Sequence, residues 1–264
     1  MITEQAQNEP ITIGIHGAIR HGKTTFAEAL QMAEPNSLYY ESSTIISEVL
    51  DRAHEEMTEP FSDDRVTLIN ELLSKLPPIL KEVVHVDTEV KQLLFTEADA
   101  INNLDMHKKL LEHAVRLQQM PGLAKQRVTP ENKEYYRAGL QGIGGYLVAK
   151  VSNTIWYDEI IRRSKADATD ATKLVVVGGL RYPADAEVVR GNHGFIVEVV
   201  RPFAPETDTT DPTEFYRKQI KSHSKIINNG DIDDMHAIGK IFYDDLQTGI
   251  IKPVYIASTS SADA

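Results

Sequence analysis

The stretch that most restricts the fold runs from Ile11 to Leu30, ITIGIHGAIRHGKTTFAEAL. Within it, Gly17, four further residues and the run Gly22-Lys23-Thr24 match the Walker A pattern of a phosphate-binding loop. In such a loop, backbone N–H groups surround phosphate oxygens, the lysine reaches the outer phosphates and the hydroxyl holds Mg²⁺. An apolar run precedes the glycines and an amphipathic run follows them, which predicts a strand, a loop and a helix. This context favours a phosphate site over a structural glycine turn with a solvated lysine.

Segments typical of strands and of helices alternate along much of the chain. We expect strands at 11–15, 37–40, 173–179, 195–202 and 225–229. We expect helices at 24–33, 41–56, 184–192 and 231–246, and one long helix at 135–163. Asp231 suits the N-cap of the last helix. The alternation predicts a P-loop NTPase-like three-layer α/β/α fold with a mostly parallel sheet.

The middle of the chain has a different pattern of apolar residues. Residues 57–130 show little strand signal and carry apolar residues at helical spacing. Pro77-Pro78 and Pro121-Gly122 are expected to separate the helices there. We therefore predict a single domain over 1–264, with a core at 11–56 and 131–256 and a helical insertion at 57–130.

Composition narrows the function classes. The net charge of -11 argues against nucleic acid or an anionic membrane as a partner, but it is compatible with a small phosphorylated ligand in a basic cleft. The absence of cysteine excludes disulfides and thiolate catalysis, and the nine histidines show no zinc-binding spacing. The N-terminal residues do not resemble a signal peptide, and no apolar run has the length of a membrane span. We expect a cytoplasmic protein.

Several arginines are candidates for phosphate contacts, each with a simpler alternative. Arg181 follows the run VVVGG, where open α/β sheets bind ligands, although a surface salt bridge to Asp185 would also explain it. An acid that orients a metal would normally end this strand, but Gly178 and Gly179 stand there. Arg20 either covers a base or phosphate or is solvated at the loop tip.

Two further groups of polar residues have the same double interpretation. Arg137 and Gln141 lie one helical turn apart and either contact a base or phosphate or are solvated, whereas Trp156 on the same expected helix suits core packing. The basic segment from Arg201 to Lys225 is either a lid over phosphates or solvated surface.

Taken together, these segments resemble a family. The motifs GAIRHGKTT, YRAGLQGIGGYL followed by IW, GGLRYPADAEVV, FIVEVVRP and SHSKIINNGDIDDMHAIGKI occur in the order found in phage-type deoxynucleoside monophosphate kinases, within the adenylate-kinase-like P-loop group. The similarity covers 11–50 and 135–246. The resemblance implies that Lys23 and Thr24 handle the phosphates of ATP and Mg²⁺. It also implies that Arg137, Gln141 and Arg181 line the acceptor side, that Arg201 begins the lid, and that Asn228 and Asn229 lie near the ATP base. The chain departs from the family at Gly179, where an aspartate is usual.

These observations predict an ATP-dependent (deoxy)nucleoside monophosphate kinase that transfers the γ-phosphoryl group to a small phosphorylated acceptor. The alternatives are a nucleotide-binding protein with little or no transfer activity and a kinase of another small metabolite. We expect small nucleotides as partners and allow for a homodimer. The assigned residues are Lys23, Arg181 and Arg201 for catalysis; Gly17, Arg20, Gly22, Lys23, Thr24, Thr25 and Asn229 for ATP; Glu41, Arg137, Gln141 and Arg181 for the acceptor; and Thr24 for Mg²⁺.

Overall fold

The computed structural model describes residues 9–57, 62–86, 93–101, 105–204 and 212–251. The chain divides into two compact units. The first, here called the sheet unit, combines Met1–Tyr40 with Ile161–Ala264, and the second, the helical unit, is Glu41–Ile160. The helical unit therefore begins before the expected insertion at 57–130 and ends after it.

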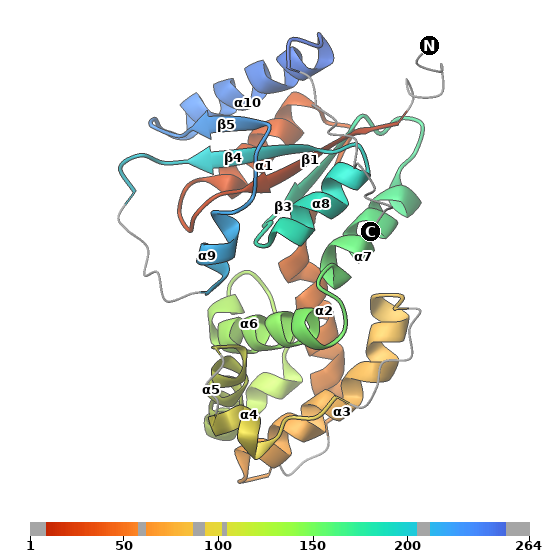
Figure 1. The fold of residues 1–264 in the computed structure, drawn as a ribbon, viewed down its shortest axis with the longest axis vertical. Helices are drawn as coiled ribbons and strands as arrows, with labels where there is room; N and C mark the ends of the chain where they lie inside the picture. Colours follow the sequence, from red (N-terminus) through yellow and green to blue (C-terminus); the bar gives the residue numbers. More distant parts are fainter. Residues whose placement is uncertain (1–8, 58–61, 87–92, 102–104, 205–211, 252–264) are drawn as a thin grey trace, which may run out of the picture. The chain divides into compact units, whose positions relative to one another are not determined.

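The sheet unit is built on five parallel strands in the order β2-β3-β1-β4-β5. Figure 1 labels β3, β1, β4 and β5 among them. The expected α/β class with a parallel sheet is confirmed. β1 lies in the centre, where its Ile13 pairs with Val176 of β3 on one side and with Phe195 of β4 on the other. The strands span Ile11–His16 (β1), Ser37–Glu41 (β2), Leu174–Gly178 (β3), Phe195–Val200 (β4) and Ser224–Ile227 (β5).

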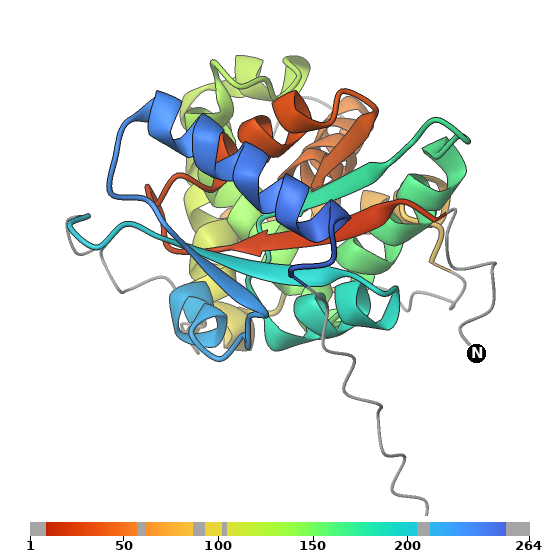
Figure 2. The ribbon, with the colours of Figure 1, turned by 90° about the horizontal axis from the view of Figure 1, so that it is seen from above.

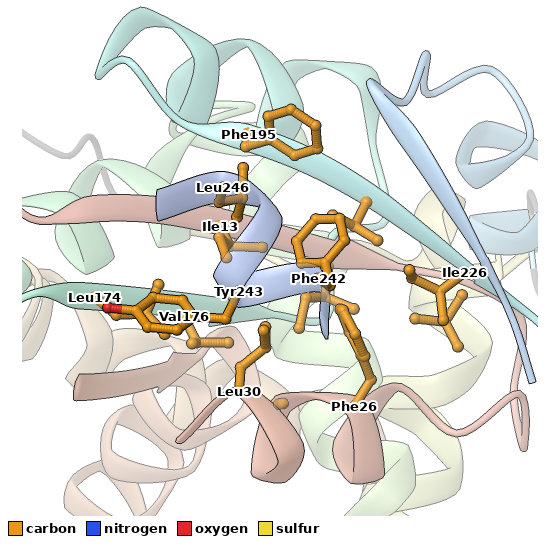
Figure 3. Packing of buried hydrophobic residues seen from close by; sticks show 14 of the residues in the cluster. Ile13, Phe26, Leu30, Leu174, Val176, Phe195, Ile226, Phe242, Tyr243 and Leu246 are labelled. Atoms are coloured by element: carbon orange, nitrogen blue, oxygen red, sulfur yellow. The ribbon is translucent and has the colours of Figure 1, made fainter. Parts of the chain in front are cut away.

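Helices cover both faces of this sheet. Helices α1 (Lys23–Ala33) and α10 (Ile232–Gln247) lie on one face and α8 (Pro183–Gly191) lies on the other (Figure 2). The apolar side chains between the sheet and the first pair of helices form the main core of the unit (Figure 3). In that core, Phe26 of α1 and Phe242 of α10 meet edge to face with ring centroids 5.6 Å apart. Burial of these rings fixes α1, and therefore the loop that precedes it, on the sheet.

The start of α10 follows the expected capping chemistry. The Asp231 carboxylate accepts the N–H of Asp234 at 3.0 Å, and the Asp234 carboxylate accepts the N–H of Asp231 at 3.1 Å. This reciprocal pair satisfies two N–H groups that the helix itself leaves without acceptors. The prediction of Asp231 as N-cap is confirmed.

Helices form all the regular structure that the described residues of 42–160 contain. The described residues of 57–130 are helical wherever they form regular structure, as predicted. Among the described segments, no helix combines the length and apolarity that crossing a bilayer requires. The helices that lie wholly or partly in this unit are α2 (Ser42–Glu55), α3 (Arg65–Val83), α4 (Glu97–Ile101), α5 (Asp105–Gln119), a 3₁₀ helix (Pro121–Lys125), α6 (Lys133–Lys150) and α7 (Ile155–Asp167).

Two expectations about helix boundaries are wrong. Pro77 and Pro78 lie inside α3 instead of ending a helix, and the buried side chains of Leu76 and Ile79 keep its apolar face continuous across them. The expected long helix at 135–163 is two helices, because residues 151–154 leave the helical path. There the Ser152 hydroxyl accepts the Thr154 N–H, and the Thr154 hydroxyl donates to Asp158. Such local side-chain bonds compete with the helix and start a new one.

Candidate functional site

The loop between β1 and α1 has the backbone that its glycines suggested. Gly22 has φ 92°, in the left-handed region, and Arg20 also has a positive φ of 65°. A Cβ at Gly17 would lie 2.3 Å from the Val199 carbonyl oxygen, and a Cβ at Gly22 would lie 2.3 Å from Nδ2 of Asn228. Both glycines are therefore required by close neighbours as well as by the turn itself.

The lysine of the motif folds back over this loop. Its Nζ donates hydrogen bonds to the carbonyl oxygens of Gly17 at 2.9 Å and of Ala18 at 2.8 Å. The first hydrogen bond of α1 runs from the Phe26 N–H to the Gly22 carbonyl, so the N–H groups of residues 23–25 precede the helical ladder. The positive end of the helix dipole and the Lys23 ammonium thus lie at the same loop. Thr24 is exposed and Thr25 is half-buried beside them.

The topology places this loop at a switch point of the sheet. From β1 the chain continues through α1 to β2 at one edge, whereas from β4, the neighbour of β1, it continues to β5 at the other edge. In open parallel sheets, ligands bind outside the carboxyl ends of two strands that diverge in this way. The loop follows the carboxyl end of β1, and Arg201 follows that of β4, with an exposed side chain.

Residues from distant segments hold the loop in place. The buried Asn228 side chain, at the end of β5, donates from Nδ2 to the His21 carbonyl at 2.9 Å. The backbone N–H of Arg201 donates to Nδ1 of His21 at 3.3 Å. Before the loop, Nε2 of the buried His16 lies 2.7 Å from the Ser222 hydroxyl. The sequence analysis missed these contacts, because nothing local to the motif signals them.

His16, just before the loop, and His21, within it, both have lowered pKa values. Burial lowers the pKa of His16 to about 4, and burial also lowers the pKa of His21. Nearby Arg217 and Lys23 act in the same direction on both imidazoles. A neutral His21 keeps the lone pair on Nδ1 that accepts the Arg201 N–H.

The basic segment after β4 is partly engaged in ion pairs. Helix α9 (Pro212–Arg217) forms within it, which the sequence analysis did not predict. Arg217 is largely buried, pairs with Glu214 at 2.9 Å and approaches Glu198 of β4 at 4.0 Å. Lys225 pairs with the same Glu198 at 3.0 Å. The expected lid also includes residues 205–211, which lie outside the described residues.

Arg181 follows β3, as expected, and its side chain is exposed. The Asp185 side chain is buried, and its Oδ2 accepts hydrogen bonds from the backbone N–H groups of Arg181 and Tyr182, each at 2.8 Å. Burial raises the pKa of Asp185 to about 7, and the two N–H groups oppose that shift. Asp185 therefore fixes the backbone that presents Arg181, which gives it a role that the surface salt-bridge interpretation did not include.

The structure explains why glycine occupies positions 178 and 179, shortly before Arg181. A Cβ at Gly178 would lie 2.7 Å from the Tyr39 hydroxyl, and Gly179 has φ 75°. The end of β3 thus carries a tyrosine hydroxyl close to the backbone, where a metal-orienting acid was expected. In the described part of the chain, no cluster of three or more acidic, histidine or cysteine side chains is arranged to hold a metal ion.

The acceptor residues Glu41, Arg137 and Gln141 belong to the helical unit. Arg137 forms a forked ion pair with Glu134, with Nη2 to Oε2 at 2.6 Å. Glu41 accepts the Ser43 hydroxyl at 2.9 Å, and Nζ of Lys133 donates to that hydroxyl at 3.0 Å. Gln141 is half-buried one turn after Arg137. Ser43 and Lys133 are polar neighbours of Glu41 that the sequence analysis did not single out.

The structure thus brings together the loop residues Gly17, Gly22, Lys23, Thr24 and Thr25 within the sheet unit. Arg20 and Asn229 are exposed, and it is Asn228, not Asn229, whose side chain contacts the loop. Of the two side chains that the resemblance placed near the ATP base, that of Asn228 binds the loop backbone, and that of Asn229 is exposed. Neither a protein-family model nor a curated protein sequence matches the chain.

Proposed function

We propose that the protein is an ATP-dependent (deoxy)nucleoside monophosphate kinase. The observation that carries this proposal is the Lys23 ammonium bound to the carbonyls of a glycine loop at the start of α1. A cation held there, with the N-terminus of a helix beside it, suits the outer phosphates of a nucleoside triphosphate. The position of the loop at the switch point of a parallel sheet supports the same ligand class.

In this proposal, residues of the sheet unit bind the donor. Lys23 leaves the loop carbonyls to contact the β- and γ-phosphates, while the loop N–H groups between Gly17 and Gly22 surround them. Thr24 and Thr25 begin the helix beside the phosphates. Arg20 and Asn229, both exposed, contact the outer parts of the nucleotide.

The remaining assigned residues act on the transferring phosphoryl group or on the acceptor. Arg181 and Arg201 follow the strands on either side of β1 and neutralise charge on the transferring phosphoryl group. Glu41, Arg137 and Gln141 select the acceptor. The reaction needs little covalent chemistry from the protein, because alignment and charge neutralisation lower most of the barrier.

Mg²⁺ fits the residues at this loop. The exposed Thr24 hydroxyl is a hard oxygen donor, and Mg²⁺ in such sites takes its other ligands from phosphate oxygens and water. When bound, the ion neutralises charge on the β- and γ-phosphates.

The end of β3 favours a second candidate function, a nucleotide-binding protein with little transfer activity. Gly178 and Gly179 leave no carboxylate there, and the Tyr39 hydroxyl occupies the space beside Gly178. A chain that binds ATP tightly but does not orient the metal would act as a sensor or an interaction module.

Calorimetric titration with ATP and Mg²⁺ tests the shared claim, and ADP release with a panel of deoxynucleoside and ribonucleoside monophosphates separates the two functions. Lys23→Ala should lower ATP affinity or abolish transfer, since it removes the charge directed at the outer phosphates. Absence of ATP binding by the unmutated protein would refute both functions. Binding without ADP release for any acceptor would leave the second.

A further inference from the structure

We propose that Asn228 is a positioning residue that sets the direction of one loop N–H group, that of Gly22. The inference rests on the proposed function, in which the loop N–H groups receive phosphate. It assigns to Asn228 a task on the loop backbone and not at the nucleotide base. Asn228 lies at the carboxyl end of β5. Its side chain contacts the carbonyl of His21, which is 207 residues earlier in the chain.

The argument begins with the geometry of one peptide group. The carbonyl of His21 and the N–H of Gly22 belong to the same planar trans peptide and therefore point in opposite directions. Nδ2 of Asn228 donates to that carbonyl at 2.9 Å. Holding the carbonyl toward β5 makes the Gly22 N–H point away from β5.

Glycine at position 22 makes this control necessary. Its φ of 92° lies in a region that only glycine adopts freely, and a peptide flip between residues 21 and 22 would carry φ into a region that glycine adopts as easily. The residue that permits the turn thus does not itself fix the direction of its N–H. An external hydrogen bond has to favour one orientation.

Packing shows that Asn228 and Gly22 fit each other. Asn228 is buried, with 6% of its surface exposed, and a Cβ at Gly22 would lie 2.3 Å from its Nδ2. The backbone N–H of Asn228 donates to the Val200 carbonyl at 2.7 Å, which anchors the residue to the end of β4. The amide is therefore held from the sheet and has no room to move toward the loop without displacing it.

His21 is held on its other side as well. Its Nδ1 accepts the N–H of Arg201, so the residue is tied to β4 through its ring and to β5 through its carbonyl. These two contacts restrain the residue before Gly22 from turning with the peptide. Because this orientation exists in the free protein, phosphate would meet an N–H group already directed away from β5, and such preorganisation strengthens anion binding.

The test compares Asn228→Asp and Asn228→Ala with the control Ile227→Asp. Asn228→Asp keeps the shape but replaces the donor with acceptors that repel the His21 carbonyl and attract the Gly22 N–H after a flip. Ile227→Asp adds the same charge one residue away, at an exposed side chain that has no role in the proposed site. By calorimetry with ATP and Mg²⁺, Asn228→Ala should bind about tenfold more weakly and Asn228→Asp about a hundredfold, with Ile227→Asp within about threefold of the unmutated protein.

A second readout needs no nucleotide. In ¹⁵N–¹H spectra of the free protein, the Gly22 amide proton should move downfield and exchange more slowly in Asn228→Asp, because it then donates to a carboxylate. An unchanged Gly22 resonance would overturn the inference even if ATP binding fell. Equal losses of affinity in Asn228→Asp and Ile227→Asp would overturn it too, since charge alone would then account for both. If the unmutated protein binds no ATP, the proposed function fails, and the Gly22 resonance still decides the role of Asn228.

Discussion

A buried pair of histidines in the helical unit should make its stability depend steeply on pH. His54 of α2 and His113 of α5 lie with their Nε2 atoms 3.0 Å apart and their rings stacked at 5.2 Å between centroids. Both side chains are buried. Burial lowers the pKa of His54 to about 4 and that of His113 to about 3, and His54 itself acts in the same direction on His113. At neutral pH the pair is therefore uncharged, and one Nε2–H donates to the other ring.

The sign of the effect follows from proton uptake. In the unfolded chain both imidazoles titrate near pH 6.5, whereas in the folded protein they stay neutral until about pH 4 or below. The unfolded state thus binds more protons over this range, and the free energy of unfolding falls as the pH falls. Between pH 7.5 and pH 5.0 each imidazole contributes a loss of about 2 kcal/mol, or about 4 kcal/mol for the pair. The loss ends below the folded pKa values.

The helical unit contains its own fluorescent reporter. Trp156 is the chain's single tryptophan, it is buried in this unit, and its Nε1 donates to the Gly144 carbonyl. Urea unfolding followed by tryptophan fluorescence at pH 7.5 and 5.0 gives the two free energies of unfolding. The comparison protein is the double variant His54→Leu with His113→Leu, which removes both titrating groups and retains apolar volume.

The difference between the two proteins isolates the pair. The double variant should lose about 4 kcal/mol less than the unmutated protein between the two pH values, because contributions from His16 and His107 are common to both. A double variant with the full pH dependence would refute the reasoning. If the variant does not fold, the ring C–H resonances of the unmutated pair decide: titration near pH 6.5 would be incompatible with burial of neutral rings.

Two further predictions concern the sheet unit. Gly239→Val should lower the free energy of unfolding by about 1–3 kcal/mol, since even a Cβ there would lie 2.4 Å from the Ala29 Cβ of α1. Urea unfolding followed by circular dichroism measures this change. The control is Gly191→Ala, which should change the free energy of unfolding little because a Cβ there has open space around it. Arg181→Lys should reduce acceptor-dependent ADP release about tenfold to a hundredfold and leave ATP affinity unchanged, because an ammonium cannot replace forked phosphate contacts. Equal, small effects of Arg181→Lys and Asp185→Asn on ADP release would reject the phosphate role.

The parts of the fold that sequence predicted are those with a local cause. The apolar run at 11–15, the glycines of the loop and the amphipathic run after it each act over a few residues, and β1, the loop and α1 form as expected. The cap at Asp231 is equally local. Alternation of strands and helices then sufficed for a parallel sheet, since parallel neighbours require crossover connections.

The failures have tertiary causes. Pro77 and Pro78 would end an isolated helix, but the burial of Leu76 and Ile79 outweighs the lost hydrogen bonds. The break at 151–154 was hidden because apolar periodicity continues on both sides of it. The backbone contacts of Asp185 were missed for the same reason: the sequence offered it only as an alternative salt-bridge partner of Arg181, and its burial beside two N–H groups depends on the fold.

The same distinction applies within the loop itself. The motif of Gly17, Gly22, Lys23 and Thr24 lies within eight consecutive residues, so the sequence pattern alone reveals it. The atoms that hold the loop come from elsewhere: a Val199 carbonyl excludes a side chain at Gly17, and an Asn228 amide excludes one at Gly22 and binds the carbonyl before it. Each glycine therefore satisfies a local turn and a distant neighbour at once. The contacts from β4 and β5 therefore show how the loop backbone is held in place, which the spacing alone does not reveal.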